Sequence, residues 1–260
     1  MSPFLPLNRY FRTTIRETKF KSLGMRKIML ACALIAWGTI AAQEVEWSEL
    51  TKANGRVTGI LPVQGKKFYT TRWSGGMLLG SAQLTYHDDF LVYAQEKIAA
   101  KVENSAANIN DIVSFNGKVI VFLTDKQDGL HKLYMQRYGV DCVPEGEPEQ
   151  LAEYTIPKGW RTSGYFNVLQ SQNQQFFCVE YAIPQNKAEN ERFGFKVLNA
   201  SFETVSEGEY ESPYEARQSD ISNRYLSNTG DYFMAVKVYN INDRGRVKDY
   251  TSLEKFVLMH

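Results

Sequence analysis

The chain has 260 residues, of which 43% are hydrophobic and 13% aromatic, and its formal net charge is +1. The first 42 residues hold seven basic side chains and one acidic side chain, so the rest holds 23 of the 30 basic and 28 of the 29 acidic residues, a formal charge of −5. A mildly acidic chain without a basic run gives no electrostatic basis for binding nucleic acid or an anionic membrane surface.

The N-terminal region has the features of an export signal. Arg26 and Lys27 precede an uncharged apolar segment, residues 28–40, and the small residues Ala41 and Ala42 follow it. This order predicts a Sec signal peptide cleaved after Ala42, with Ala41 as the second choice. A membrane-spanning helix needs roughly 20 apolar residues, so we expect no transmembrane span once the signal is removed, and an uncleaved anchor is the alternative.

These features divide the chain into three expected parts. Residues 1–42 form a basic extension plus the signal peptide, residues 43–60 an entry linker, and residues 61–260 a β-repeat domain. Translation starts at Met1 or at Met25, whose Met-Arg-Lys opening suits a signal peptide unaided. The expected location is exported: periplasmic, outer-membrane-associated or extracellular in a bacterium.

Two cysteines follow the signal, Cys142 and Cys178. An oxidising compartment permits a disulfide between them. Cys178 also lies in the apolar run Phe176–Val179, where a buried free thiol is as natural. Both alternatives stay open at this point.

A repeat is the most informative internal feature. The segments Ser114–Phe122, Ser171–Val179 and Ser227–Ala235 each begin with a turn and continue as an apolar strand, and their serines lie 57 and 56 residues apart. A fainter earlier copy is Val63–Tyr69. Four related units are therefore expected.

The second halves of the units also correspond. Leu133–Tyr138, Phe193–Leu198 and Leu253–Met259 are expected to be strands in matching places. Glu-Gly-Glu at residues 145–147 and 207–209 is expected to form an acidic turn after the first two of them. No such turn follows the third strand, so an array lacking its C-terminal region is favoured.

The connections between these strands read as hairpins. Asp128-Gly129 is a strong two-residue hairpin signal, and residues 184–191 and 240–248 are longer polar loops in the same place. The Ala-rich segment Gln95–Asn110 is the nearest approach to helical spacing, and we expect a short helix or a loop there.

The resulting fold class is all-β, with repeated antiparallel sheet units arranged as an incomplete propeller of three or four blades. A twisted β-sandwich is the alternative. The spaced Asn/Gly turns, apolar strands and Glu-Gly-Glu segments resemble the TolB-like and WD40-like propeller repeats of bacterial envelope proteins, over roughly residues 60–260. The resemblance implies a binding or scaffolding surface and brings no catalytic residues.

Motifs for cofactor and nucleophile chemistry are absent from the sequence. The chain has no Gly-x-Ser-x-Gly elbow, no P-loop and no Gly-x-Gly-x-x-Gly segment, so no catalytic residue and no cofactor is assigned. The densest metal-ligand group, His87-Asp88-Asp89, alternates its side chains and is expected to be a solvated turn. Residues 125–129 and 240–245 each lack a third calcium ligand, so no metal site is assigned.

Aromatic and acidic side chains remain as binding candidates. Trp73, Trp160 and Tyr165 are the candidates for a ligand-stacking surface. The repeated Glu-Gly-Glu carboxylates favour a structural role, because a catalytic site is normally single. We therefore expect an exported binding or scaffolding module with a protein or glycan partner. The alternative is a secreted carbohydrate-active or peptide-cleaving hydrolase. Glycoside hydrolysis would require two carboxylates about 5–10 Å apart in a pocket.

Overall fold

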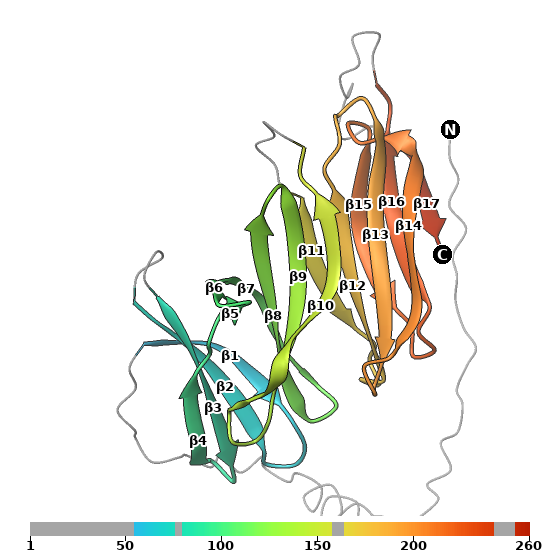
Figure 1. Ribbon diagram of the computed structural model, residues 1–260. Coiled ribbons are helices and arrows are strands. Elements are labelled where there is room, and N and C mark those ends of the chain that lie inside the picture. The colour runs from blue at the N-terminus through green and yellow to red at the C-terminus, as the bar shows by residue number, and fades with distance from the viewer. Residues whose placement is uncertain (1–54, 76–79, 158–163, 242–252) are drawn as a thin grey trace, which may run out of the picture. The chain divides into compact units, whose positions relative to one another are not determined.

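The structure is a computed structural model that describes residues 55–75, 80–157, 164–241 and 253–260. All of these residues belong to one compact unit, 50–260. The secondary structure of the described residues consists of strands, turns and bends (Figure 1). No segment in them forms a helix of the length and apolarity that a membrane crossing requires.

Four antiparallel sheets follow one another along the chain, each made of consecutive strands, and are called blades 1 to 4 (Figure 1). Blade 1 contains β1 (Arg56–Pro62), β2 (Phe68–Ser74), β3 (Ser81–Asp88) and β4 (Leu91–Lys97). Blade 2 contains β7 (Asn108–Phe115), β8 (Lys118–Gln127), β9 (Leu130–Tyr138) and β10 (Pro144–Thr155). Blade 3 contains β11 (Tyr165–Gln170), β12 (Phe176–Ile183), β13 (Asn190–Asn199) and β14 (Thr204–Glu215). Blade 4 contains β15 (Ser219–Leu226), β16 (Tyr232–Tyr239) and β17 (Leu253–Met259).

The first strands of successive blades meet. β1 contacts β7, β7 contacts β11, and β11 contacts β15. This arrangement of antiparallel repeats is propeller-like, as predicted, and the sandwich alternative is not what forms. β1 begins at Arg56, within the segment 43–60 that was expected to be a linker.

The repeated turns occupy equivalent places, between the first and second strands of their blades. In blade 3 the Phe176 N–H donates to Ser171 Oγ (2.9 Å), and in blade 4 the Asp231 N–H donates to Ser227 Oγ (2.9 Å). A serine hydroxyl thus closes both turns. The repeat of turn and strand found in the sequence is confirmed.

The Glu-Gly-Glu prediction is wrong. Residues 145–147 lie in β10 and residues 207–209 in β14, so these segments form the fourth strands of their blades rather than turns. Gly146 has φ of 74° beside a break in the β9–β10 register, and a Cβ on Gly208 would meet the Phe195 ring at 3.6 Å. Glycine is favoured at a bulge in a strand and where an aromatic ring packs across a strand. The glycine of each Glu-Gly-Glu segment therefore has a role within a strand, although glycine is also typical of turns.

Of the predicted connections, one is confirmed and another is wrong. Asp128 and Gly129 have φ of 53° and 77° and join β8 to β9, as the dipeptide predicts. Residues 95–110 form neither a helix nor a loop: they contain the end of β4, the hairpin of β5 (Lys101–Val102) and β6 (Ser105–Ala106), and the start of β7. Ala100 and Ala107 of this segment pack on the first core. Of the predicted loop 184–191, residues 184–189 join β12 to β13 and the last two residues belong to β13. Most of the predicted loop 240–248 lies outside the described residues.

In the described part of the chain, three hydrophobic cores lie between neighbouring blades. They form because side chains along a strand point alternately to its two faces. On β8, Val119, Val121 and Leu123 belong to the core shared with blade 1. The intervening Ile120 and Phe122 belong to the core shared with blade 3. Every second residue of a central blade thus faces one neighbour, and the blades stack through apolar side chains from both sheets.

The two cysteines lie in different cores and are both free. Cys142, between β9 and β10, packs in the core of blades 1 and 2, where burial raises the pKa of its thiol to about 11. Cys178, on β12, packs in the core of blades 3 and 4, where burial also raises the thiol pKa. The disulfide alternative is therefore not what the structure shows, because each side chain points into a separate core.

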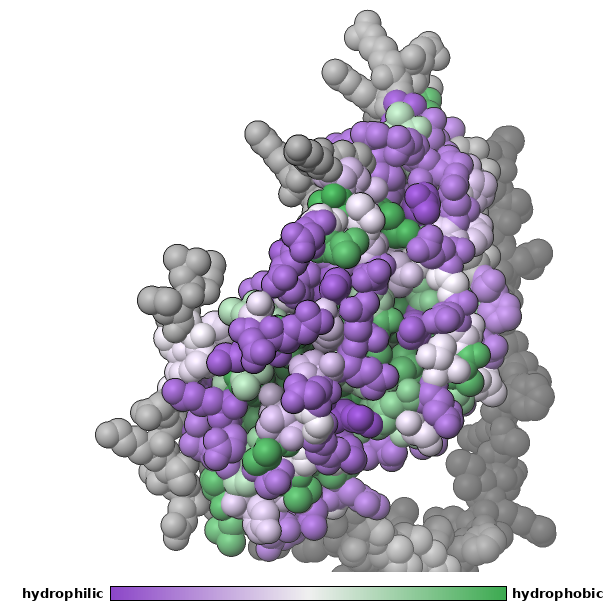
Figure 2. All heavy atoms as spheres, in the orientation of Figure 1, coloured by the Kyte–Doolittle hydropathy of each residue, from purple (hydrophilic) through white to green (hydrophobic). Residues whose placement is uncertain are grey.

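The surface of the blades is mixed in character. Figure 2 shows one face on which hydrophilic residues predominate and hydrophobic residues form small patches between them. The most exposed large apolar side chains of the described residues include Leu91 and Tyr93, at 71% and 69%, on the last strand of blade 1. Scattered exposed apolar residues are normal in soluble domains and do not by themselves identify a site.

Candidate functional site

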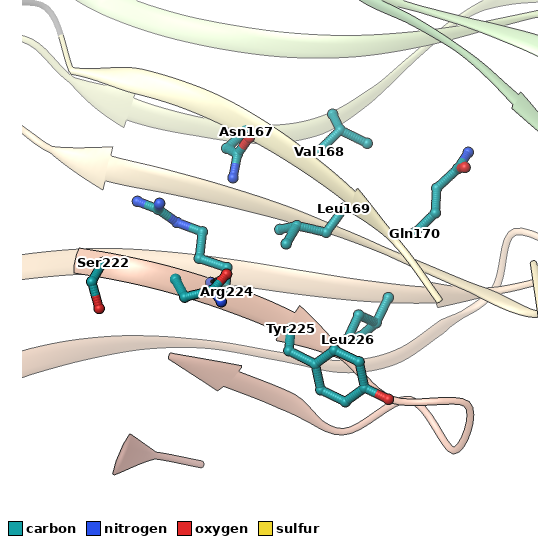
Figure 3. Close-up of a pocket in the computed structure, with 9 residues that line it drawn as sticks. Asn167, Val168, Leu169, Gln170, Ser222, Arg224, Tyr225 and Leu226 are labelled. Carbon is teal, nitrogen blue, oxygen red and sulfur yellow. Dashed lines mark hydrogen bonds between the residues drawn. The ribbon is translucent and has the colours of Figure 1, made fainter. Parts of the chain in front are cut away.

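The candidate site is a groove between the first strands of blades 3 and 4 (Figure 3). Its volume is about 390 Å³, within the range of small-ligand sites. Figure 3 shows Arg224 and Leu226 of β15 pointing toward β11, with the Tyr225 ring pointing away. The lining residues are Asn167, Val168, Leu169 and Gln170 of β11 and Ser222, Asn223, Arg224, Tyr225 and Leu226 of β15.

A buried ion pair lies at one end of this groove. The Glu180 side chain, on β12, is fully buried and accepts a hydrogen bond from Arg224 Nε. Tyr232 and Tyr165 also donate hydroxyl hydrogens to this carboxylate, at 2.8 and 3.4 Å. Arg224 donates a second bond, from Nη2 to the Tyr165 hydroxyl at 2.6 Å. The charge of Arg224 is thus neutralised from within the blade junction, and the guanidinium is held in one orientation.

Burial and charge shift the pKa values around this pair. Burial, followed by the negative charge of Glu180, raises the pKa of Tyr165 to about 12. The same two causes raise the pKa of Tyr232. Burial opposes ionisation of Arg224, but its bond and charge interaction with Glu180 outweigh this and raise its pKa. Both tyrosines therefore stay protonated as donors at neutral pH, and Arg224 stays charged.

A second acid lies in the electrostatic neighbourhood of the pair. Burial raises the pKa of the Glu191 carboxyl, and the charges of Glu180 and Asp220 add to the rise. A hydrogen bond from Ser219 Oγ (2.7 Å) and the charge of Arg224 oppose it. Glu191 is therefore within electrostatic reach of the ion pair, although it does not line the groove.

The buried ion pair departs from the pattern of the other blades. Glu180 pairs with Asn167 in the β11–β12 ladder, and Phe122 pairs with Asp111 at the matching place in blade 2. Arg224 stands two residues before the end of β15, as Val168 does on β11. The junction of blades 2 and 3 therefore has two apolar side chains where the next junction has two charges.

Sequence reasoning missed both charged residues. The available signal was Glu180 itself, a single acid in the otherwise uncharged strand Phe176–Ile183. A charge in such a strand is rarely buried without a partner. Its partner, Arg224, lies 44 residues further along the chain. The pattern of residues within a strand does not predict which distant residues come into contact.

The two described residues of the predicted stacking surface lie in different blades. Trp73 lies on β2 of blade 1, 37% exposed, with its ring against Gly80. Tyr165 lies on β11 of blade 3, 42% exposed, and its hydroxyl is engaged by the ion pair. Trp160 lies outside the described residues. A ligand-stacking surface formed by all three residues stays a prediction. Tyr165 alone lies beside the groove.

The solvated turn expected at residues 87–89 is found at Asp89, which is exposed, but the prediction is wrong for His87. His87 is 8% exposed on β3, its ring stacks on Phe68 with centroids 4.6 Å apart, and its Nε2 lies 3.0 Å from Thr70 Oγ1. Its two acidic neighbours form ion pairs with Lys66 and Lys67 instead. Across the described residues, no group of three His, Cys, Asp or Glu side chains is placed to hold a metal ion.

A second hollow lies where the repeated turns of blades 1 to 3 approach one another. Its volume is about 390 Å³, and its lining includes the carboxamides of Gln64, Asn116 and Asn173. Hydrogen bonds tie these turns to the neighbouring blades, such as Asn116 Nδ2 to Ala200 O at 3.3 Å. The amides therefore hold the blades together at this end, and we assign the hollow no separate role.

Comparison with known proteins does not assign the chain to a family. No protein-family model matches the chain, and no curated protein matches it. Among solved structures, an endo-arabinase from Bacteroides thetaiotaomicron is similar at a TM-score of 0.33 and 14% identity, over 74% of this chain and 69% of that one. The site must therefore be interpreted from its own residues.

Proposed function

We propose that the chain is an exported binding module of the bacterial cell envelope, with a protein or glycan partner seated in the groove between β11 and β15. One observation carries this proposal: the nine residues that line the groove include no carboxylate. The nearby Glu180 is fully buried and already shared among Arg224, Tyr165 and Tyr232. Glycoside hydrolysis needs two carboxyl groups that reach the scissile bond, and this lining does not supply them.

The alternative is a secreted carbohydrate-active or peptide-cleaving hydrolase. Glu191 favours it, because a partly buried carboxyl with a raised pKa is a common form of a general acid. However, Glu191 does not line the groove, and Ser219 Oγ binds it at 2.7 Å. We therefore rank binding above hydrolysis, and the experiment below separates them.

Binding without turnover is the first expected result. The secreted protein is applied to arrays of uncharged peptides and of neutral and acidic oligosaccharides, and the supernatants are analysed by mass spectrometry for cleavage products. We expect retention on one array and no products. Asn167→Tyr, which places a ring in the groove, should abolish retention, while Val205→Tyr on the exposed outer strand of blade 3 should not. Cleavage that disappears in Glu191→Gln would favour the hydrolase instead.

Export gives the second expected result. Because residues 26–42 have the order of a signal peptide, mature protein from the producing cell should begin near Ala42 or Gln43. N-terminal sequencing of the periplasmic and extracellular fractions measures this directly. Ile35→Arg, which interrupts the apolar segment, should leave the full-length chain in the cell. An abundant soluble cytoplasmic product that begins at Met1 or Met25 would contradict the export proposal.

A further inference from the structure

The β11 strand has main-chain groups that face the groove. The Ser171 N–H donates to Phe176 O, so Ser171 is bonded to the β12 side. In an antiparallel ladder, the bonding side alternates from residue to residue. Val168 and Gln170 therefore direct their N–H and C=O groups away from β12. The Phe166 carbonyl, two residues earlier, confirms this phase, because it accepts a bond from Asn110 of β7 rather than from β12.

The same reasoning applies to β15, with a different result. The Ser227 N–H donates to Asp231 O, so Arg224 and Leu226 direct their main-chain groups away from β16. The Arg224 N–H is already satisfied, because it donates to the Asn223 side chain at 2.8 Å. Neither β11 nor β15 has a strand partner on this edge in the described sheets. β11 thus offers the N–H and C=O groups of Val168 and Gln170, since the Phe166 carbonyl is already engaged by Asn110, and β15 offers fewer such groups.

These edges identify the chemistry of an occupant. An extended peptide presents an N–H and a C=O on one side at every second residue, roughly every 6.7 Å, which is the spacing of Val168 and Gln170. Sugar hydroxyls have no such fixed alternation of donors and acceptors. The lining is also uncharged apart from Arg224, which Glu180 neutralises, so the groove favours a peptide without charge.

We propose that the groove binds an uncharged, extended peptide segment of a partner protein, which pairs with the β11 edge as an added strand. This inference rests on the proposed function and specifies its partner. Main-chain hydrogen bonds supply the affinity in this form of recognition, and neighbouring side chains select the sequence. Asn167, Leu169 and Arg224 are the side chains placed to make that selection.

A proline substitution tests the pairing. Val168→Pro removes an N–H that faces the groove and is not part of the β11–β12 ladder, so the blade should still form, as prolines are accepted on strand edges. Val205→Pro is the matched control, because Val205 lies on the outer strand of blade 3 at a break in register and is 55% exposed. Circular dichroism spectra and thermal unfolding of both variants establish that they fold.

The probe is the tightest-binding uncharged peptide from the array, labelled for fluorescence polarisation. We expect Val168→Pro to weaken binding by about tenfold or more, and Val205→Pro to leave it unchanged. Methylation of the peptide's own backbone nitrogens at alternate positions should weaken binding equally. Peptide affinity that is insensitive to both changes would overturn the inference.

The two proposals fail in different ways. Retention of oligosaccharides but not peptides, lost in Asn167→Tyr, would overturn the peptide inference and leave the binding module standing. Retention on neither array would overturn the proposed function as well. Peptide retention that survives Asn167→Tyr would place the site elsewhere and overturn the groove assignment.

Discussion

Replacing Glu180 by alanine is expected to lower the free energy of unfolding by about 3–5 kcal/mol. The substitution removes the partner of Arg224, whose side chain is only 20% exposed, and leaves its charge without compensation at the blade junction. It also deprives the hydroxyls of Tyr232 and Tyr165 of their acceptor. Urea unfolding of the mature protein, followed by far-ultraviolet circular dichroism, measures the change.

The fold itself provides the control for this result. The junction of blades 2 and 3 has Phe122 and Val168 in the places of Glu180 and Arg224. The double variant Glu180→Leu/Arg224→Val should therefore recover most of the stability lost by Glu180→Ala, because replacing a buried ion pair by apolar residues is often neutral or stabilising. The single variants Glu180→Leu and Arg224→Val complete this comparison. If the losses of unfolding free energy in the two single variants add up to the loss in the double variant, the two residues do not act as one coupled unit.

The Glu180–Arg224 ion pair is expected to have a role in ligand binding at the groove, because burying two charges carries a desolvation penalty. If stability alone mattered, this junction could use apolar residues as its neighbour does. The pair instead fixes a guanidinium at the groove wall and keeps the local charge neutral. The double variant should thus be stable but impaired in ligand selection, which separates the structural role of the pair from its role in binding.

The fold class was predictable because strand alternation and turn chemistry are local signals. Ser171 and Ser227 close equivalent turns, and Asp128-Gly129 closes a hairpin, all within a few residues of the signal. The Glu-Gly-Glu segments were misread because glycine marks bulges and ring contacts in strands as well as turns. The sequence alone does not show whether a glycine lies in a turn, at a bulge or under an aromatic ring, because this depends on which side chain packs against it.

The repeat alignment illustrates a second limit. Aligning Ser114 with Ser171 places Val119 opposite Phe176, yet Val119 faces the preceding blade and Phe176 packs in the core with the following one. The turn after β7 is the two residues 116–117, while the turn after β11 spans residues 171–175. The two turns thus differ in length by three residues. Because strand faces alternate with a period of two, an odd difference in turn length reverses the facing of the whole strand.

The groove could not be predicted for the same reason. Its lining combines residues from β11 and β15 that lie about fifty positions apart, and its polar character comes partly from main-chain groups. Main-chain groups carry no sequence signal, since every non-proline residue has them. Only the register of each ladder shows which of them face the groove, and register depends on the tertiary fold.

The second large effect is expected at Phe177. Its side chain is fully buried on β12, and its ring lies 5.1 Å from that of Phe115 and 5.9 Å from that of Phe122, both in blade 2. Phe177→Ala should lower the free energy of unfolding by about 3–5 kcal/mol, because the lost transfer energy is increased by the cavity that remains. Tyr225→Ala is the aromatic control, since Tyr225 is 55% exposed and should change stability by about 0.5 kcal/mol or less.

The location of the destabilisation is as informative as its size. Phe177 belongs to blade 3, but the side chains that enclose it come largely from blade 2, so the cavity should loosen both blades. Hydrogen exchange should therefore increase in β7 and β8 as well as in β12, whereas blade 1, which shares a different core, should change least. Faster exchange confined to blade 3 would show that the blades are stable separately. In that case the cores between them would not set the stability of the fold.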